Sequence, residues 1–207
     1  MILSTAYFPN IQYLSKFYIQ NESPVIDIFE HFERKSYRNR CEILSANGVL
    51  GLTVPVVKAQ RKTIIKDLKL DKSSDWQKKH LKAIESAYNS APFFEYIMPD
   101  FFPVFEKRFE YLIDLNNFIF ELLLNYFPNH NSYSFSKSYC QTNYNYDYRN
   151  LISPQKNSQA LDAHFLSEVY YQTFQDKFPF AENLSCIDLL FNEGSNAESI
   201  LIKSILK

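Results

Sequence analysis

Glycine is scarce in this chain of 207 residues, which contains only Gly48, Gly51 and Gly194. Loops that wrap phosphates with backbone amides depend on glycine, and neither G-x-G-x-x-G nor G-x-x-x-x-G-K-[ST] occurs in the sequence. The sequence therefore excludes a standard Rossmann dinucleotide site and a P-loop. Any bound phosphate must be held by side chains or by helix N-termini.

Cysteine is also sparse, and the three cysteines Cys41, Cys140 and Cys186 lie far apart. An odd number of isolated cysteines predicts reduced thiols and a cytoplasmic protein rather than a disulfide framework. Arg40 could lower the pKa of its neighbour Cys41, but we expect Cys41 to be a small buried residue. The histidines show no H-x-H or H-x-x-x-H spacing and G-x-S-x-G is absent, so we expect neither a metal site nor another cofactor.

Long apolar runs are missing as well. The most apolar stretches, residues 93–105 and 118–124, are too short to span a bilayer and are interrupted by proline or acidic residues. The N-terminus lacks the basic region and the continuous apolar region of a signal peptide. With 46% hydrophobic and 17% aromatic residues, the composition indicates one globular domain with a sizeable core.

The net charge of −1 conceals a strong asymmetry along the chain. Residues 34–82 contain 13 Lys/Arg and 4 Asp/Glu, a net charge of +9, and the remainder carries −10. Such a segment can attract an anionic ligand, although a solvated basic surface would have the same composition. Aromatic residues interleaved with the basic ones would suit nucleic acid. The acidic remainder disfavours the wrapping of a long polyanion.

Hydrophobic periodicity divides the single expected domain into four parts. These are an α/β part (1–72), a helical part (73–128), a polar strand and loop (129–158) and C-terminal helices (159–207). Apolar runs before and after a helical pattern beginning at Asn10 predict a βαβ unit with parallel strands. We therefore expect an α/β (or α+β) fold with a mixed sheet and a helical half.

Turn residues set further boundaries. The pair Asn47-Gly48 lies between two β-favouring runs and predicts a hairpin, because both residues tolerate positive φ. Pro92, Pro99 and Pro103 are expected to divide the aromatic-rich stretch after residue 91 into short helical pieces. Gly194 is expected to end the first of two C-terminal helices.

The basic segment KSYRNR at residues 35–40 is the first candidate site. The guanidinium groups of Arg38 and Arg40 match phosphate oxygens, and Lys35 adds a point charge. In an extended conformation, alternation would place Arg38 and Arg40 on one face and Lys35, Tyr37 and Asn39 on the other. We expect this segment to hold a diphosphate, and the alternative is a charged edge strand.

Two further groups could contribute to the same site. The turn after the first strand offers polar side chains for a sugar or base, because ligands of open α/β sheets bind at that edge. These side chains are Tyr7, Asn10, Gln12 and Tyr13. Trp76 and His80 lie at positions i and i+4 of a predicted helix, where a stacking wall and a general base could meet. Ordinary core roles are the alternative for all six residues.

Several segments together resemble the WbqC-like family of bacterial proteins. They occur in family order from about residue 5 to 194 and include AYFPNIQYLSKF, KSYRNRCEI, LTVPV, DWQKKHLKAIESAYNSAPFFEYI, DLN, YYQTF and LSCIDLLFNEG. The resemblance implies a cytoplasmic role in the biosynthesis of surface polysaccharides such as O-antigen, and it supplies no established catalytic residues. Ala6 stands where the family more often has Gln, so the choice of substrate can differ.

Taken with the candidate residues, the resemblance implies the transfer of an acyl or aminoacyl group, such as glycine, to an amino sugar on a nucleotide or lipid diphosphate. In this hypothesis His80 removes a proton from the attacking amine. The alternative is a non-catalytic protein that binds a nucleotide sugar and presents it to a glycosyltransferase. A nucleotidyltransferase-like enzyme ranks lower, because His-x-Gly-His does not follow the first strand. The oligomeric state stays open.

Overall fold

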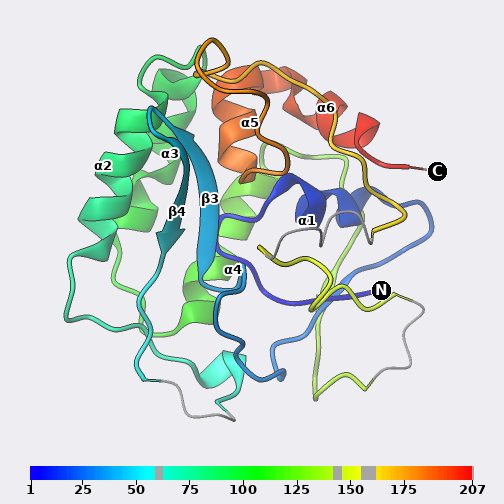
Figure 1. The fold of residues 1–207 in the computed structure, drawn as a ribbon. Helices are drawn as coiled ribbons and strands as arrows, with labels where there is room; N and C mark the ends of the chain where they lie inside the picture. Colours follow the sequence, from blue (N-terminus) through cyan, green and yellow to red (C-terminus); the bar gives the residue numbers. More distant parts are fainter. Residues whose placement is uncertain (59–62, 142–145, 155–161, 207) are drawn as a thin grey trace.

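The computed structural model describes residues 1–58, 63–141, 146–154 and 162–206. Helices lie on both sides of a two-stranded hairpin (Figure 1). A second, three-stranded sheet is parallel and includes the first strand of the chain. Three 3-10 turns, at Lys16–Tyr18, Ile65–Asp67 and Gly194–Asn196, complete the regular structure of the described residues. The strands and α-helices are β1 (Ile2–Leu3), α1 (Ile11–Ser15), β2 (Val25–Ile26), β3 (Arg40–Ser45), β4 (Gly48–Thr53), α2 (Trp76–Tyr88), α3 (Phe94–Glu106), α4 (Leu112–Leu124), β5 (Ser134–Phe135), α5 (Cys186–Glu193) and α6 (Ala197–Lys203).

The N-terminal βαβ unit is confirmed. β1 pairs in parallel with β2, and β5 adds a third parallel strand beside β2. Asn10 caps α1 as expected, because its Oδ1 accepts a hydrogen bond of 2.9 Å from the backbone N–H of Tyr13. The strands and α1 are shorter than the apolar runs that predicted them, and α1 continues as a 3-10 turn.

The hairpin at Asn47-Gly48 is also confirmed. β3 and β4 pair antiparallel from Arg40–Thr53 to Ser45–Gly48, and the positive φ of +95° falls on Gly48. The extended conformation considered for residues 35–39 is wrong, because these residues form turns and Lys35 has a φ of +58°. Strand geometry begins only at Arg40, so alternation does not apply to the basic segment.

The structure confirms α2, α4 and the two C-terminal helices, with Gly194 at the end of α5. Pro92 lies in the turn before α3, but the expected breaks at Pro99 and Pro103 are wrong, because α3 is one helix of 13 residues that contains both prolines. A proline inside a helix costs about 3 kcal/mol. α3 buries an apolar stripe that includes Ile97, Phe101 and Val104, and each such side chain contributes about 1.5–3 kcal/mol. Burial therefore outweighs the lost backbone hydrogen bonds.

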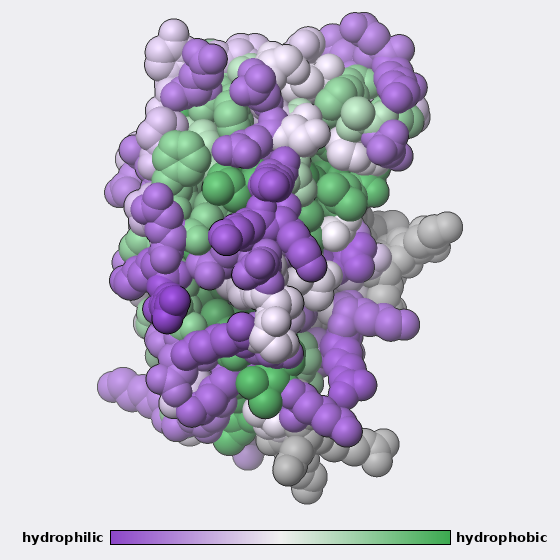
Figure 2. Space-filling model, turned by 90° about the vertical axis from the view of Figure 1, so that its left-hand side faces the viewer, coloured by the Kyte–Doolittle hydropathy of each residue, from purple (hydrophilic) through white to green (hydrophobic). Residues whose placement is uncertain are grey.

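One continuous core joins the hairpin to the helices. Cys41, Ile43 and Leu52 of the hairpin are buried in it, and β3 packs against both α2 and α5. The face of the molecule on the side of α2 carries many hydrophilic side chains (Figure 2). Lys78 and Lys82 of α2 are exposed. Within the described ranges, no helix is long and apolar enough to cross a membrane.

Candidate anion-binding site

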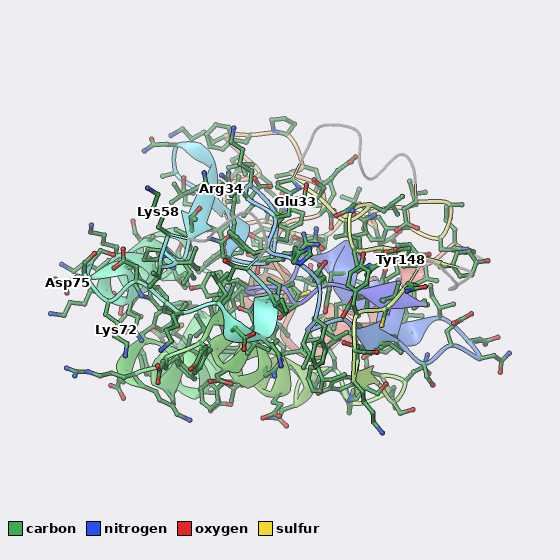
Figure 3. All side chains as sticks on the ribbon, turned by 90° about the horizontal axis from the view of Figure 1, so that it is seen from below. Glu33, Arg34, Lys58, Lys72, Asp75 and Tyr148 are labelled. Atoms are coloured by element: carbon green, nitrogen blue, oxygen red, sulfur yellow. The ribbon has the colours of Figure 1, made fainter. Side chains whose placement is uncertain are left out.

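A cavity of about 360 Å³ lies between the chain that enters β3 and the chain that leaves β4. We call it the basic pocket. Arg34 and Lys58 approach it from these two segments and lie near each other in Figure 3. Its lining residues are Phe32, Arg34, Lys35, Asn39, Arg40, Thr53, Val54, Pro55, Val56 and Lys58.

The two walls of the basic pocket are held together by hydrogen bonds beyond the end of the hairpin. The backbone N–H of Val54 donates to the carbonyl of Asn39 at 2.8 Å, and Asn39 Nδ2 donates to the carbonyl of Val54 at 2.8 Å. Asn39 is buried and fixes the walls through this pair of bonds. The turn at Lys35 then redirects the chain, so that Arg34 and Lys35 are exposed at the rim.

The charged residues that line the basic pocket in the described part of the chain are all positive. Four of its lining residues are Lys or Arg, and no acidic residue lines it in the part of the chain that the structure describes. Arg40 pairs with Glu42 at 3.1 Å, whereas Arg34, Lys35 and Lys58 form no ion pair within 4.0 Å among the described residues. Arg40 Nε is buried without a hydrogen-bond partner in the same set of residues. The pocket therefore holds unused positive charge and an unused donor.

Arg38 does not reach the basic pocket. Its side chain is 3% exposed and forms two hydrogen bonds with Glu30, from Nε to Oε1 at 2.8 Å and from Nη2 to Oε2 at 2.5 Å. Nη2 also donates to the backbone carbonyl of Arg149 at 3.2 Å. Burial raises the pKa of Glu30, and Arg38 opposes that rise. The common face expected for Arg38 and Arg40 is wrong, because Arg38 turns inward to neutralise a buried carboxylate.

His80 lies behind a wall of the basic pocket and does not line it. It is 5% exposed, and its Nδ1 lies 2.9 Å from the hydroxyl of Tyr7. Burial lowers the pKa of His80 to about 4, and a hydrogen bond with the backbone of Thr53 opposes part of this decrease. The ring is therefore neutral at pH 7. In the neutral ring one nitrogen donates and the other accepts, and Tyr7 and the backbone of Thr53 are the partners of the ring. Thr53 itself lines the basic pocket.

Trp76 packs against His80 with ring centroids 5.3 Å apart, so the structure does bring these two predicted residues together. Tyr7 joins them at a centroid distance of 6.3 Å from Trp76. The outer side of Trp76 lines a different cavity, at the beginning of α2. The Tyr7–Trp76–His80 group thus lies in the core, close to both cavities.

The remaining residues predicted from the first turn are buried away from the basic pocket. Tyr13 donates its hydroxyl to the carbonyl of Ser4 at 2.8 Å, and Asn10 serves as the cap of α1. Gln12 Nε2 donates to Asp162 Oδ2 at 2.8 Å. The geometry gives these side chains interior partners and does not bring them to Arg40.

Asp162 belongs to a third cavity. It forms a fully buried ion pair of 2.5 Å with Lys16, whose pKa is lowered by burial. Asp162 also lines an open cavity of about 240 Å³ together with Tyr148 and His164. Tyr148 lies far from Arg34 and Lys58 in Figure 3, so this cavity is separate from the basic pocket.

Among the polar and charged residues of the pocket, Arg34, Thr53 and Lys58 were not selected as site residues from the sequence, and the apolar lining residues Phe32, Val54, Pro55 and Val56 were not selected either. The predicted hairpin contained the signal, because an antiparallel register that pairs Arg40 with Thr53 brings the flanking cations toward each other. Among the described residues, no three His, Cys, Asp or Glu side chains converge as a metal site would require.

The profile of the WbqC-like protein family matches residues 5–200 of the chain. The chain belongs to the WbqC-like protein family. The match covers nearly the whole chain and includes the basic pocket and the Tyr7–His80 pair of this WbqC-like protein. Searches of curated proteins and of solved structures found no match.

Proposed function

We propose that this WbqC-like protein binds a phosphate-bearing small molecule in the basic pocket, and that a nucleotide sugar or a lipid-diphosphate sugar is its substrate class. The observation that carries the proposal is the convergence of Arg34, Lys35, Arg40 and Lys58 on one cavity that has no acidic lining residue in the described part of the chain. The cytoplasmic, surface-polysaccharide role implied by the family supports a sugar as the remainder of the ligand.

The lining explains how such a ligand would be held. Arg34 and Arg40 each offer a planar fork of donors for phosphate oxygens, and Lys58 adds a point charge that needs no fixed direction. Phe32 and Val56 belong to an apolar part of the lining that can exclude water from one side of the ligand. The volume of about 360 Å³ lies within the range of roughly 300–1,000 Å³ that is usual for ligand pockets.

Acyl or aminoacyl transfer is the second candidate function, and His80 is the observation that favours it. Burial lowers the pKa of His80 to about 4, so its ring is neutral at pH 7, and it interacts with the backbone of Thr53, a residue that lines the basic pocket. As a base it would take a proton from the amine of the sugar while the amine attacks the acyl carbonyl and the donor leaves. Because both ring nitrogens have partners, His80 would first have to give up its contact with Thr53 or Tyr7. The geometry thus supports binding more directly than transfer.

The binding proposal is tested by a thermal-shift screen of nucleotide sugars, bare nucleotides, acyl-CoAs and single-stranded oligonucleotides at two salt concentrations. A ligand at one hundred times its dissociation constant stabilises the protein by about 2.7 kcal/mol. We expect a response to phosphate-bearing sugars that weakens at higher salt and is lost in the double variant Arg34→Gln, Lys58→Gln. Both side chains are exposed, so the unliganded variant should melt as the wild type does.

The matched control is the double variant Lys79→Gln, Lys82→Gln, which removes two exposed charges of α2 that line none of the three cavities. This control should keep the full response. An equal loss in both double variants would mean that only the overall charge matters, and silence from every phosphate-bearing sugar would reject the proposal. For transfer, His80→Gln should keep binding and lose turnover, and unchanged turnover would exclude His80 as the base.

A further inference from the structure

A second cationic cavity of about 360 Å³ opens at the beginning of α2. We call it the α2 pocket. Two of its lining residues, Lys72 and Asp75, are labelled in Figure 3. They lie apart from the labelled Arg34 and Lys58 of the basic pocket. Its lining residues are Leu70, Lys72, Ser74, Asp75, Trp76, Gln77, Lys78, Phe105, Arg108 and Phe109.

Three cations from three separate segments converge on the α2 pocket. Lys72 comes from the chain before α2, Lys78 from α2 itself, and Arg108 from the chain after α3. All three side chains are exposed, and none forms an ion pair within 4.0 Å among the described residues. Asp75 is the single acidic residue of the lining, so the formal charge of the lining is positive.

The cations are attached to a fixed frame. Gln77 Nε2 donates to the carbonyl of Val104 at 3.0 Å and to the carbonyl of Lys107 at 2.9 Å. These bonds tie the first turn of α2 to the end of α3 and hold the backbone immediately before Arg108. Asp75 and, near Lys72, the carboxylate of Glu110 offset part of the positive charge, and the charge that remains can attract an anion.

One wall of the α2 pocket is aromatic. Trp76, Phe105 and Phe109 line it, and each is less than a tenth exposed. An aromatic surface next to cations suits a ligand with a planar ring and phosphate groups, because rings stack on aromatic side chains and phosphates bind Lys and Arg.

The α2 pocket and the basic pocket adjoin the same pair of backbone segments. Val56, which lines the basic pocket, forms a β-bridge with Leu70, which lines the α2 pocket. The backbone hydrogen bonds from Val57 to Lys69 and from Asp71 to Pro55, both 2.9 Å, reinforce this connection. The two cavities are therefore neighbours that lie on either side of this pair of hydrogen-bonded segments.

We propose that the α2 pocket is a second ligand site and that it binds a nucleoside phosphate through Lys72, Lys78 and Arg108. The site stands on its own lining residues and goes beyond the function proposed for the basic pocket. Two neighbouring sites for phosphorylated ligands form the arrangement that transfer between two bound substrates requires, whereas presentation of a single precursor needs only one.

The chain offers a selective probe, because Trp76 is its only tryptophan and lines the α2 pocket. The experiment is a titration with uridine diphosphate, followed by tryptophan fluorescence and in parallel by calorimetry. We expect a saturable fluorescence change whose dissociation constant rises about tenfold or more in Arg108→Gln, because a hydrogen bond to a charged group contributes about 1.5–3 kcal/mol. Lys58→Gln, in the basic pocket, is the matched control and should leave the fluorescence titration unchanged.

Different results would contradict the second site, the choice of a nucleoside phosphate as its ligand, and the basic pocket. A wild-type titration without a fluorescence change, together with a calorimetric constant that Arg108→Gln leaves unaltered, would overturn the second site. Inorganic pyrophosphate binding as tightly as uridine diphosphate would overturn the assignment of a nucleoside. The basic pocket is judged separately, by the response of Arg34→Gln, Lys58→Gln to a nucleotide sugar, so either site can fail without the other.

Discussion

Replacing Arg38 with alanine should destabilise the protein strongly, although Arg38 lies in the most basic stretch of the sequence. The guanidinium binds both oxygens of Glu30, and the two side chains are 3% and 6% exposed. Arg38→Ala would leave the Glu30 carboxylate buried without its counter-ion, a change that costs about 3–5 kcal/mol. For a protein of this size the melting temperature should fall by about 6–20 °C.

The loss should depend on pH in a defined direction. Burial raises the pKa of Glu30 in the folded protein, and removing Arg38 raises it further. A carboxyl whose folded pKa is raised contributes stability that is present below the unfolded pKa, about 4.3, and is lost as pH rises through the folded pKa. The deficit of Arg38→Ala relative to the wild type should therefore shrink toward pH 4 and grow toward pH 8.

Denaturant unfolding at several pH values measures this effect. Arg40→Ala is the matched control, because the Arg40 side chain is 37% exposed and its pair with Glu42 contributes about 1 kcal/mol at most. Adding Glu30→Gln to Arg38→Ala should recover part of the loss by removing the buried charge. An Arg38→Ala protein as stable as the wild type at pH 8 would refute the reasoning and return Arg38 to the candidates for ligand binding.

Two further predictions concern other buried contacts. Gly194→Ala should cost about 1–3 kcal/mol in thermal or denaturant unfolding, because Gly194 has a φ of +54° and a Cβ there would lie 2.5 Å from the ring of Phe93. Gly51→Ala is its control, since a Cβ there meets only the flexible end of Arg40, and equal losses would contradict the explanation. The hydroxyls of Tyr88 and Tyr170 donate hydrogen bonds to Asp188, and burial raises the pKa of its carboxyl to about 6. The contribution of this carboxyl to folding stability is therefore present near pH 4 and is lost as pH rises through about 6. Relative to Asp188→Asn, the wild type should therefore gain about 2 kcal/mol between pH 7 and pH 4, and a difference independent of pH would contradict the assignment.

Features decided by neighbouring residues were predictable from the sequence. Asn10 caps α1 through the N–H three residues later, and the Asn47-Gly48 hairpin needs only a short turn and two β-favouring runs. α3 was not predictable in this way. Its prolines oppose a helix locally, and only the burial of residues such as Phe101 in the assembled core decides in favour of one.

In the candidate site, too, some features were predictable from the sequence and others depend on contacts in the folded chain. The charge asymmetry pointed to the basic segment, and Lys35, Asn39 and Arg40 do line a cationic cavity. The inward direction of Arg38 depends on Glu30 and on the turn at Lys35, and lysine rarely adopts the positive φ found there.

His80 illustrates a partner that is distant in the sequence. Tyr7, 73 residues earlier, occupies one of its ring nitrogens, and the backbone of Thr53 interacts with the ring as well. Helical spacing placed Trp76 beside His80 correctly, but it gave no information about either of these partners.

The most direct test of the account is the calorimetric dissociation constant of the nucleotide sugar that the thermal-shift screen selects, measured on the wild type and on Arg34→Gln, Lys58→Gln. Losing two charged contacts, each contributing about 1.5–3 kcal/mol, should weaken binding by about a hundredfold or more while the melting temperature of the unliganded protein stays unchanged. An unchanged dissociation constant in this folded variant would contradict the central claim that the basic pocket is the binding site.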